Sequence, residues 1–314
     1  MIRRIKALWE LTRLEHGVMY GLGVILGIIV AGGRFYEPAP IFGVALVVPS
    51  QIALLGFFTA LFIQAGTFAL NDFCDLESDI ANRRIDRPLV RGVLRKEDAL
   101  LVAILATTLG IICASFLNPI LFLFALISAA LGILYDLKIK EFLAVSNGYI
   151  AFTMAIPFIF GGLIVDPGRI ELVLLILSSI AFLAGFGREV MKDIADVKGD
   201  TLRNIRSIAR VYGTEQAKRV VIFSYTLALI LSVIPFFTYH TAYFFNPAYL
   251  LPIIAADMLL VHTCFKLKPF RKRLDPKTIP FGREDVNYNT MRKETLIAIG
   301  IGLFAFVSGA LVRL

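Results

Sequence analysis

The stretch "FALNDFCDLESDIANRRIDRPLVRG", residues 68–92, marks the point where an apolar segment meets dense charge. Asn71, Asp72, Asp75 and Asp79 follow the apolar residues directly, and four arginines lie between positions 83 and 91. The whole chain is 58% hydrophobic and only 18% charged, with a mean hydropathy of +0.77. Such a composition is typical of an integral membrane protein and excludes a soluble globular domain. The charged stretch is therefore expected at a membrane boundary.

Apolar runs of membrane-spanning length recur along the chain. About 20 apolar residues bridge the hydrocarbon layer as a helix, and that length predicts nine spans. They are residues 17–33, 52–72, 99–117, 119–135, 144–165, 170–190, 217–238, 244–265 and 295–313. The sequence therefore predicts an all-α polytopic membrane protein that forms a single domain over residues 1–314.

Basic residues predict the orientation of these spans. If the amino terminus is cytoplasmic, all 32 Lys and Arg residues except Arg34, Arg169 and Arg313 fall on the inside. The positive-inside rule favours this topology, with the long loops cytoplasmic and the carboxyl terminus outside a cell membrane. Residues 1–16 are expected to form an amphipathic interfacial segment. Anionic lipid headgroups account for the net charge of +8, so no nucleic-acid or protein partner is implied.

One acidic pattern occurs twice. "NDFCDLESD" at residues 71–79, the first motif, and "KDIADVKGD" at residues 192–200, the second motif, place Asp at the same three relative positions. On a helix each set falls within an arc of about 100°. A charged residue at the end of a span is usually just a solvated helix end. Two copies in one register favour a site instead, and carboxylate oxygens suit Mg²⁺.

Other polar residues near the same predicted face are candidates for binding a substrate. Arginine guanidinium groups match phosphate oxygens, although for each arginine alone a contact with a lipid headgroup or a positive-inside anchor is the better explanation. In "YDLKIKE", residues 135–141, two side chains three positions apart share one helical face. The candidates are Arg84, Arg87, Arg91, Arg203, Tyr135 and Lys138, and Asn147 either joins them or caps a helix.

These motifs resemble the UbiA-type intramembrane prenyltransferases. The likeness is carried by the first motif with "RPLVRG" behind it, by "YDLKIK", and by "GREVMKDIADVKGD" at residues 187–200. It implies nine transmembrane helices in a ring around a central cavity. It also implies a cytoplasmic polar cap, formed by the loops 73–98 and 191–216.

The resemblance further implies a magnesium-bound polyprenyl diphosphate as the substrate. Carried over by position, the metal ligands are Asn71, Asp75, Asp79, Asp196 and Asp200, with Asp193 added as a further candidate. Asp72 is a candidate substrate contact. Lys192 stands where the first motif has Asn71; because an ammonium group cannot ligate a metal, Lys192 is predicted to hold a phosphate. The predicted catalytic residues are Asp75, Asp79, Asp196, Asp200 and Lys192.

The acceptor is a separate question. Within the family, the second motif is most similar to archaeal digeranylgeranylglyceryl phosphate synthases, which implies transfer of a geranylgeranyl group to geranylgeranylglyceryl phosphate in lipid synthesis. An anionic acceptor agrees with cations at Arg13, Lys138 and Arg203. Prenylation of an aromatic quinone precursor or of a tetrapyrrole by the same chemistry stays open.

A cation-coupled transporter is the alternative from another class. Its coupling acids are expected near the bilayer midplane, whereas both motifs lie at one face and are followed by arginines. Asp257, inside the eighth predicted span, is the exception. We interpret it as a residue paired within the helix bundle.

Overall fold

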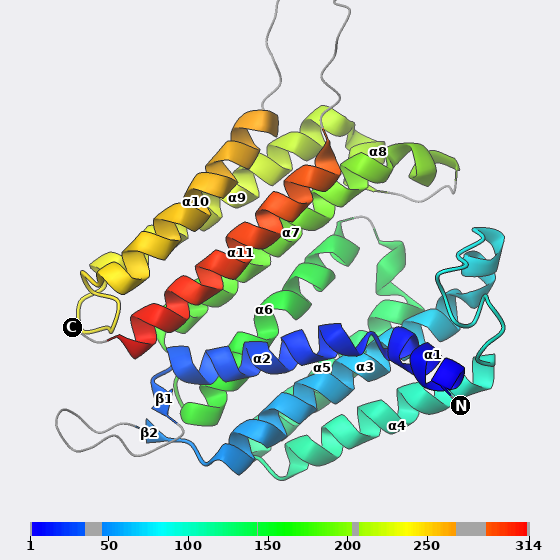
Figure 1. Ribbon diagram of the computed structural model, residues 1–314, viewed down its shortest axis with the longest axis horizontal. Coiled ribbons are helices and arrows are strands. Elements are labelled where there is room, and N and C mark those ends of the chain that lie inside the picture. The colour runs from blue at the N-terminus through cyan, green and yellow to red at the C-terminus, as the bar shows by residue number, and fades with distance from the viewer. Residues whose placement is uncertain (1, 35–45, 143, 203–206, 268–286, 313–314) are drawn as a thin grey trace, which may run out of the picture. The chain divides into compact units, whose positions relative to one another are not determined.

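The computed structural model describes residues 2–34, 46–142, 144–202, 207–267 and 287–312 (Figure 1). These ranges are almost entirely helical. The helices are α1 Ile2–Thr12, α2 Leu14–Val30, α3 Ser50–Ala81, α4 Lys96–Ser115, α5 Pro119–Leu137, α6 Val145–Val165, α7 Leu172–Leu202, α8 Ile208–Tyr212, α9 Thr214–Phe237, α10 Pro247–Leu267 and α11 Tyr288–Leu311, with the single 3₁₀ turn η1 at Ile139–Glu141.

The predicted all-α membrane fold is confirmed in the described part of the chain. Eight helices are long and apolar enough to cross a membrane, and α1 with α2 makes a ninth if the bent pair is one span. The prediction missed one feature after the first span. Strands β1, Gly33–Arg34, and β2, Leu46–Val47, pair in parallel. Strands of two residues are too short to produce an alternating pattern in the sequence.

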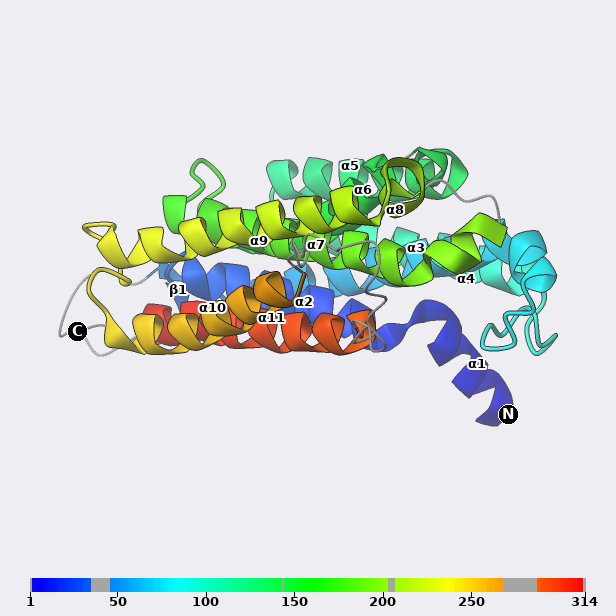
Figure 2. The same cartoon turned by 90° about the horizontal axis from the view of Figure 1, so that it is seen from above.

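Helices α1 and α2 meet at a sharp bend of 47° (Figure 2). Arg13 forms the bend in the left-handed region, with φ 43° and ψ 55°. That conformation is costly for a residue with a Cβ, so tertiary contacts must hold it. The apolar face of α1 supplies part of them, because Ala7 and Leu11 are buried against Ala69 of α3 and Leu89 of the following loop.

The chain forms two compact units. The first contains residues 1–141 and 153–178, and the second contains residues 142–152 and 179–314. In the first unit α3 packs along both α2 and α4 (Figure 1). Helices α2 and α6 approach so closely that a Cβ added to Gly27 would lie 2.2 Å from the Phe158 carbonyl oxygen. A Cβ on Gly161 would lie 2.1 Å from the Val24 carbonyl oxygen. Small residues allow this backbone contact, as is common between membrane helices.

In the second unit α10 packs against α9 and α11 (Figure 1). Its core contains the fully buried Tyr225, whose hydroxyl donates to Thr295 Oγ1 at 3.3 Å. Asp257 accepts a hydrogen bond from Ser232 Oγ at 2.8 Å. The expectation that Asp257 is paired within the bundle is therefore confirmed.

Two helices are much longer than a membrane requires. Helix α3 has 32 residues and α7 has 31. At 1.5 Å per residue each is about 47 Å long, against about 30 Å of hydrocarbon. The surplus turns can project beyond the apolar layer, and the first and second motifs occupy the carboxyl-terminal turns of α3 and α7 respectively.

Candidate active site

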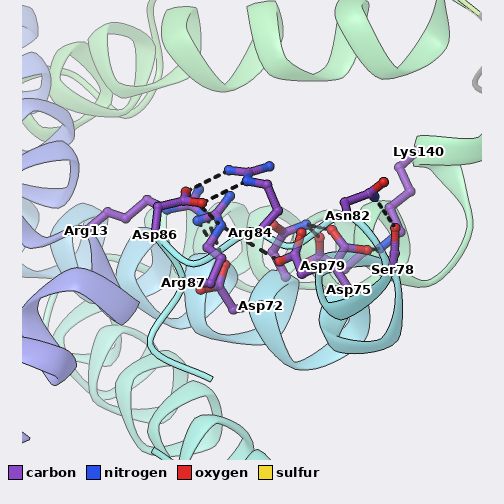
Figure 3. Close-up of polar contacts among 12 residues, drawn as sticks. Arg13, Asp72, Asp75, Ser78, Asp79, Asn82, Arg84, Asp86, Arg87 and Lys140 are labelled. Atoms are coloured by element: carbon purple, nitrogen blue, oxygen red, sulfur yellow. Dashed lines mark hydrogen bonds and ion pairs between the residues drawn. The ribbon is translucent and has the colours of Figure 1, made fainter. Parts of the chain in front are cut away.

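Asn71 lies at the centre of a polar cluster in the first unit. Its amide nitrogen donates to Asp75 Oδ2 at 3.1 Å, one turn along α3, and to Asp136 Oδ1 at 2.9 Å, in the last turn of α5. Lys140 of η1 contacts the other oxygen of Asp75 (Figure 3). Residues from two segments of the chain thus surround the first half of the predicted metal site.

Asp72 anchors a second cluster on the same helix (Figure 3). Its Oδ1 accepts from Arg13 Nη2 at 2.8 Å and lies 3.2 Å from Arg87 Nη1. Arg87 Nε also lies 3.8 Å from Asp79 Oδ2, so one guanidinium group bridges two aspartates of the first motif. The Asp72 side chain is 1% exposed. A buried carboxylate needs such partners, because removing it from water is costly.

Arg13 makes two contacts that fix its side chain. Besides the ion pair, its guanidinium carbon lies 4.4 Å from the centre of the Phe68 ring, one turn before Asp72. Stacking on an aromatic face is favourable for a guanidinium group. The sequence suggested Arg13 as a cation that could bind an anionic acceptor. In the structure the guanidinium group of Arg13 pairs with the carboxylate of Asp72.

The loop between α3 and α4 carries the other predicted phosphate ligands. Arg84 donates to both oxygens of Asp86, at 3.0 and 2.9 Å, and this hydrogen bonding lowers the pKa of Asp86 to about 2. Arg91 contacts Glu10 of α1. Arg84, Arg87 and Arg91 thus all contact carboxylates. A phosphate would have to compete with these carboxylates for the guanidinium groups.

The end of α5 and the turn η1 contribute further polar side chains near the first motif. Of the two residues singled out there, Lys138 is exposed and Tyr135 is half-buried. Asp136 and Lys140 contact Asn71 and Asp75 of the first motif, and sequence reasoning missed both as site residues. Both stand inside "YDLKIKE", but nothing local distinguishes them from their neighbours.

The second motif lies in the second unit. Asn147 of α6 donates to Asp193 Oδ2 at 2.7 Å, so this candidate bonds an acidic residue of the motif. Lys192 Nζ lies 3.5 Å from Glu189 Oε2, and Glu189 is only 7% exposed. Asp196 is exposed. The side chain of Asp200 and the whole of Arg203 lie outside the described residues.

The carboxylates of the described residues form no complete metal site by themselves. No three His, Cys, Asp or Glu side chains within those ranges are placed to hold an ion together. The predicted ligands belong partly to one unit and partly to the other. Within the first unit, Asp72 Oδ2 and Asp136 Oδ2 are buried and have no hydrogen-bond partner among the described residues. Oxygens of aspartate and asparagine are the ligands that Mg²⁺ prefers, so the chemistry of the residues fits that ion.

Comparisons with known proteins show the family of this chain. The model of the UbiA prenyltransferase family matches residues 38–281. The chain is 41% identical to a digeranylgeranylglyceryl phosphate synthase of Archaeoglobus fulgidus, over 98% of this chain and 96% of that protein. It is 30% identical to the synthase of the same name from Pyrococcus furiosus, over 98% and 99% of the two chains.

Solved structures show the same fold. One structure, described as digeranylgeranylglyceryl phosphate synthase in membranes, aligns with a TM-score of 0.76 at 26% identity and covers 98% of this chain and 99% of that one. A UbiA homologue from Archaeoglobus fulgidus bound to DMAPP and Mg²⁺ aligns with a TM-score of 0.63 at 18% identity, over 96% and 99% of the chains. This multi-pass membrane protein therefore belongs to the UbiA prenyltransferase family, as its paired motifs predicted.

Proposed function

We propose that this protein transfers a geranylgeranyl group from geranylgeranyl diphosphate to geranylgeranylglyceryl phosphate, with Mg²⁺ as cofactor and diphosphate as the leaving group. The observation that carries the proposal is the 41% identity to the Archaeoglobus fulgidus synthase over 98% of this chain. A match of that extent includes both motifs as well as the spans. The reaction belongs to archaeal ether-lipid synthesis.

Each motif contributes oxygen ligands in this proposal. The first motif offers Asn71, Asp75 and Asp79 and the second offers Asp193, Asp196 and Asp200. Bound Mg²⁺ supplies positive charge that offsets the charge developing on the diphosphate. Support for the ion also comes from the UbiA homologue bound to DMAPP and Mg²⁺.

Cationic side chains of the chain bind the remaining phosphate oxygens. Arg87 is the best placed, because Asp72 and Asp79 hold its guanidinium group beside the first motif. A guanidinium group that other side chains already hold in place loses less conformational entropy when it binds an anion. Lys192 sits beside Glu189 on α7 and serves as the phosphate contact of the second motif.

These groups stabilise the leaving group as the reaction proceeds. The allylic C–O bond breaks, its electrons pass to the diphosphate, and the acceptor hydroxyl oxygen bonds to the freed carbon while its proton is released. Charge develops mainly on the diphosphate, so interactions at that point lower the barrier. The positive-inside distribution of Lys and Arg supports an orientation with both motifs on the cytoplasmic side.

Purified protein in lipid nanodiscs, with Mg²⁺ and labelled geranylgeranyl diphosphate, tests the proposal against a panel of acceptors. We expect the label to enter geranylgeranylglyceryl phosphate and not an aromatic quinone precursor or a tetrapyrrole. Labelling of one of those rings would overturn the acceptor but keep the chemistry. If no acceptor were labelled while Asp75→Ala altered a transport flux, the prenyltransferase proposal would be lost.

A further inference from the structure

Asp136 is a buried carboxylate for which the motifs provide no role. It lies at the end of α5 and is 2% exposed. One oxygen accepts from Asn71, and the other has no hydrogen-bond partner among the described residues. Burying an acid is costly, and the hydrogen-bond partner of Asp136 is Asn71, a predicted metal ligand, so the function of Asp136 is sought at that residue.

The hydrogen bonds of Asn71 set the orientation of its amide. Both of its acceptors, Asp136 Oδ1 at 2.9 Å and Asp75 Oδ2 at 3.1 Å, are carboxylate oxygens. A carboxylate only accepts hydrogen bonds, so the NH₂ end of the amide must face both of them. The amide carbonyl oxygen then points to the other side. A flipped amide would place three oxygens against one another.

The two acceptors are not equivalent. Asp75 is itself a predicted metal ligand, and Lys140 also contacts it. Lys140 contacts the oxygen that Asn71 does not use, but an ion bound by Asp75 would compete with Asn71 for the Asp75 carboxylate. Asp136 lies on a different helix and is shielded from solvent. It can hold the amide whether or not the Asp75 carboxylate is engaged elsewhere.

We infer that Asp136 is a positioning residue for metal binding, which holds the Asn71 amide so that the Asn71 carbonyl oxygen is presented to the ion. This inference rests on the proposed function, because Asn71 is a ligand only if the site binds Mg²⁺. Hydrogen bonds that orient ligands are worth about 10- to 100-fold in metal affinity. Asp136 is expected to act through Asn71 and to touch neither ion nor substrate.

Binding of Mn²⁺ in the presence of inorganic pyrophosphate, followed by electron paramagnetic resonance, tests the inference without turnover. The full-length protein in nanodiscs is used throughout. We expect Asp136→Leu to raise the Kd for Mn²⁺ by about 10-fold or more. Asp136→Asn keeps a carbonyl oxygen that can accept from Asn71, so its Kd is expected to rise less than about 3-fold. Asp257→Leu removes another helix-embedded acid with one serine partner, and serves as the matched control with an unchanged Kd.

A double-mutant cycle separates positioning from a general structural effect. In the Asn71→Ala background, Asp136→Leu is expected to change the Kd by no more than about 2-fold, because its target is gone. An equal loss of affinity in both backgrounds would overturn the inference. Asp136→Ser is the second variant, used if the leucine variant does not fold. Its hydroxyl is too short to reach Asn71, so its Kd for Mn²⁺ is expected to rise by the amount expected for Asp136→Leu, about 10-fold or more.

The failure of this inference can be distinguished from failure of the proposed function. Wild-type protein that binds no Mn²⁺ with pyrophosphate would contradict the proposed function, and the role of Asp136 would fall with it. If the wild-type protein binds Mn²⁺ and the serine and leucine variants bind it as tightly as the wild type does, only the inference is overturned.

Discussion

Arg13 Nη2 donates to Asp72 Oδ1 at 2.8 Å, and this contact joins the bend between α1 and α2 to the first motif across 59 positions of sequence. The Asp72 side chain is 1% exposed and that of Arg13 is 21% exposed. The ion pair therefore couples the position of the amino-terminal helix to the helix that carries the candidate metal ligands.

Arg13→Gln is expected to destabilise the protein by about 1–3 kcal/mol, because it leaves a buried carboxylate with a weaker set of partners. The measurement is thermal unfolding in detergent. In an Asp72→Asn background the same change should cost much less, since no buried charge is left unpaired. Arg3→Gln, at an exposed position of α1, is the matched control. Equal losses in both backgrounds would show that the ion pair does not account for the effect.

The close contact between α2 and α6 predicts a large effect of a single methyl group. Gly27→Ala would place a Cβ 2.2 Å from the Phe158 carbonyl oxygen, so the helices must separate. We expect a loss of about 2 kcal/mol or more in thermal unfolding, at the upper end of overpacking effects. Gly300→Ala on α11 has open space around its Cβ among the described residues and should be neutral or stabilise by up to about 1 kcal/mol. Similar behaviour of the two variants would contradict the close approach.

The candidate metal ligands are expected to control turnover. Asp75→Asn or Asp196→Asn should lower kcat/KM for geranylgeranyl diphosphate by about 100-fold or more, since each removes a charge that holds the ion. Glu77→Gln, an exposed acid between Asp75 and Asp79, should stay near wild type. Activity is measured over a range of Mg²⁺ concentrations. If Glu77→Gln lost as much activity as Asp75→Asn, general surface charge and not a defined site would be responsible.

Lys192 is expected to bind phosphate and not metal. Lys192→Ala should raise KM for geranylgeranyl diphosphate by about 10-fold, the loss of one charge-assisted contact, and leave the Kd for Mn²⁺ unchanged. Lys218→Ala removes another lysine that contacts a glutamate three positions away and is the matched control. An equal loss of diphosphate and metal binding in Lys192→Ala would argue against its assigned role.

The membrane class of this protein and its series of eight or nine spanning helices could be predicted from the sequence, because they depend on local properties. The thickness of the hydrocarbon layer sets the length of each apolar run. The helical period likewise places Asn71 and Asp75 one turn apart, and the structure joins them by a hydrogen bond. The family could also be predicted, because the two motifs and the residues beside them resemble those of UbiA-type prenyltransferases, and the comparisons confirm it.

The partners of the motif residues were decided only by the tertiary structure. Asp136 and Lys140 meet the first motif across 65 positions of sequence, because the end of α5 packs beside the end of α3. Arg13 contacts Asp72 and adopts a left-handed backbone conformation at the bend between α1 and α2. No local sequence pattern predicts this bend, since arginine seldom adopts that conformation. Helical periodicity assigns a side chain to a face of its own helix. Which residue lies opposite depends on how distant helices pack, and that packing determines which charges become buried pairs.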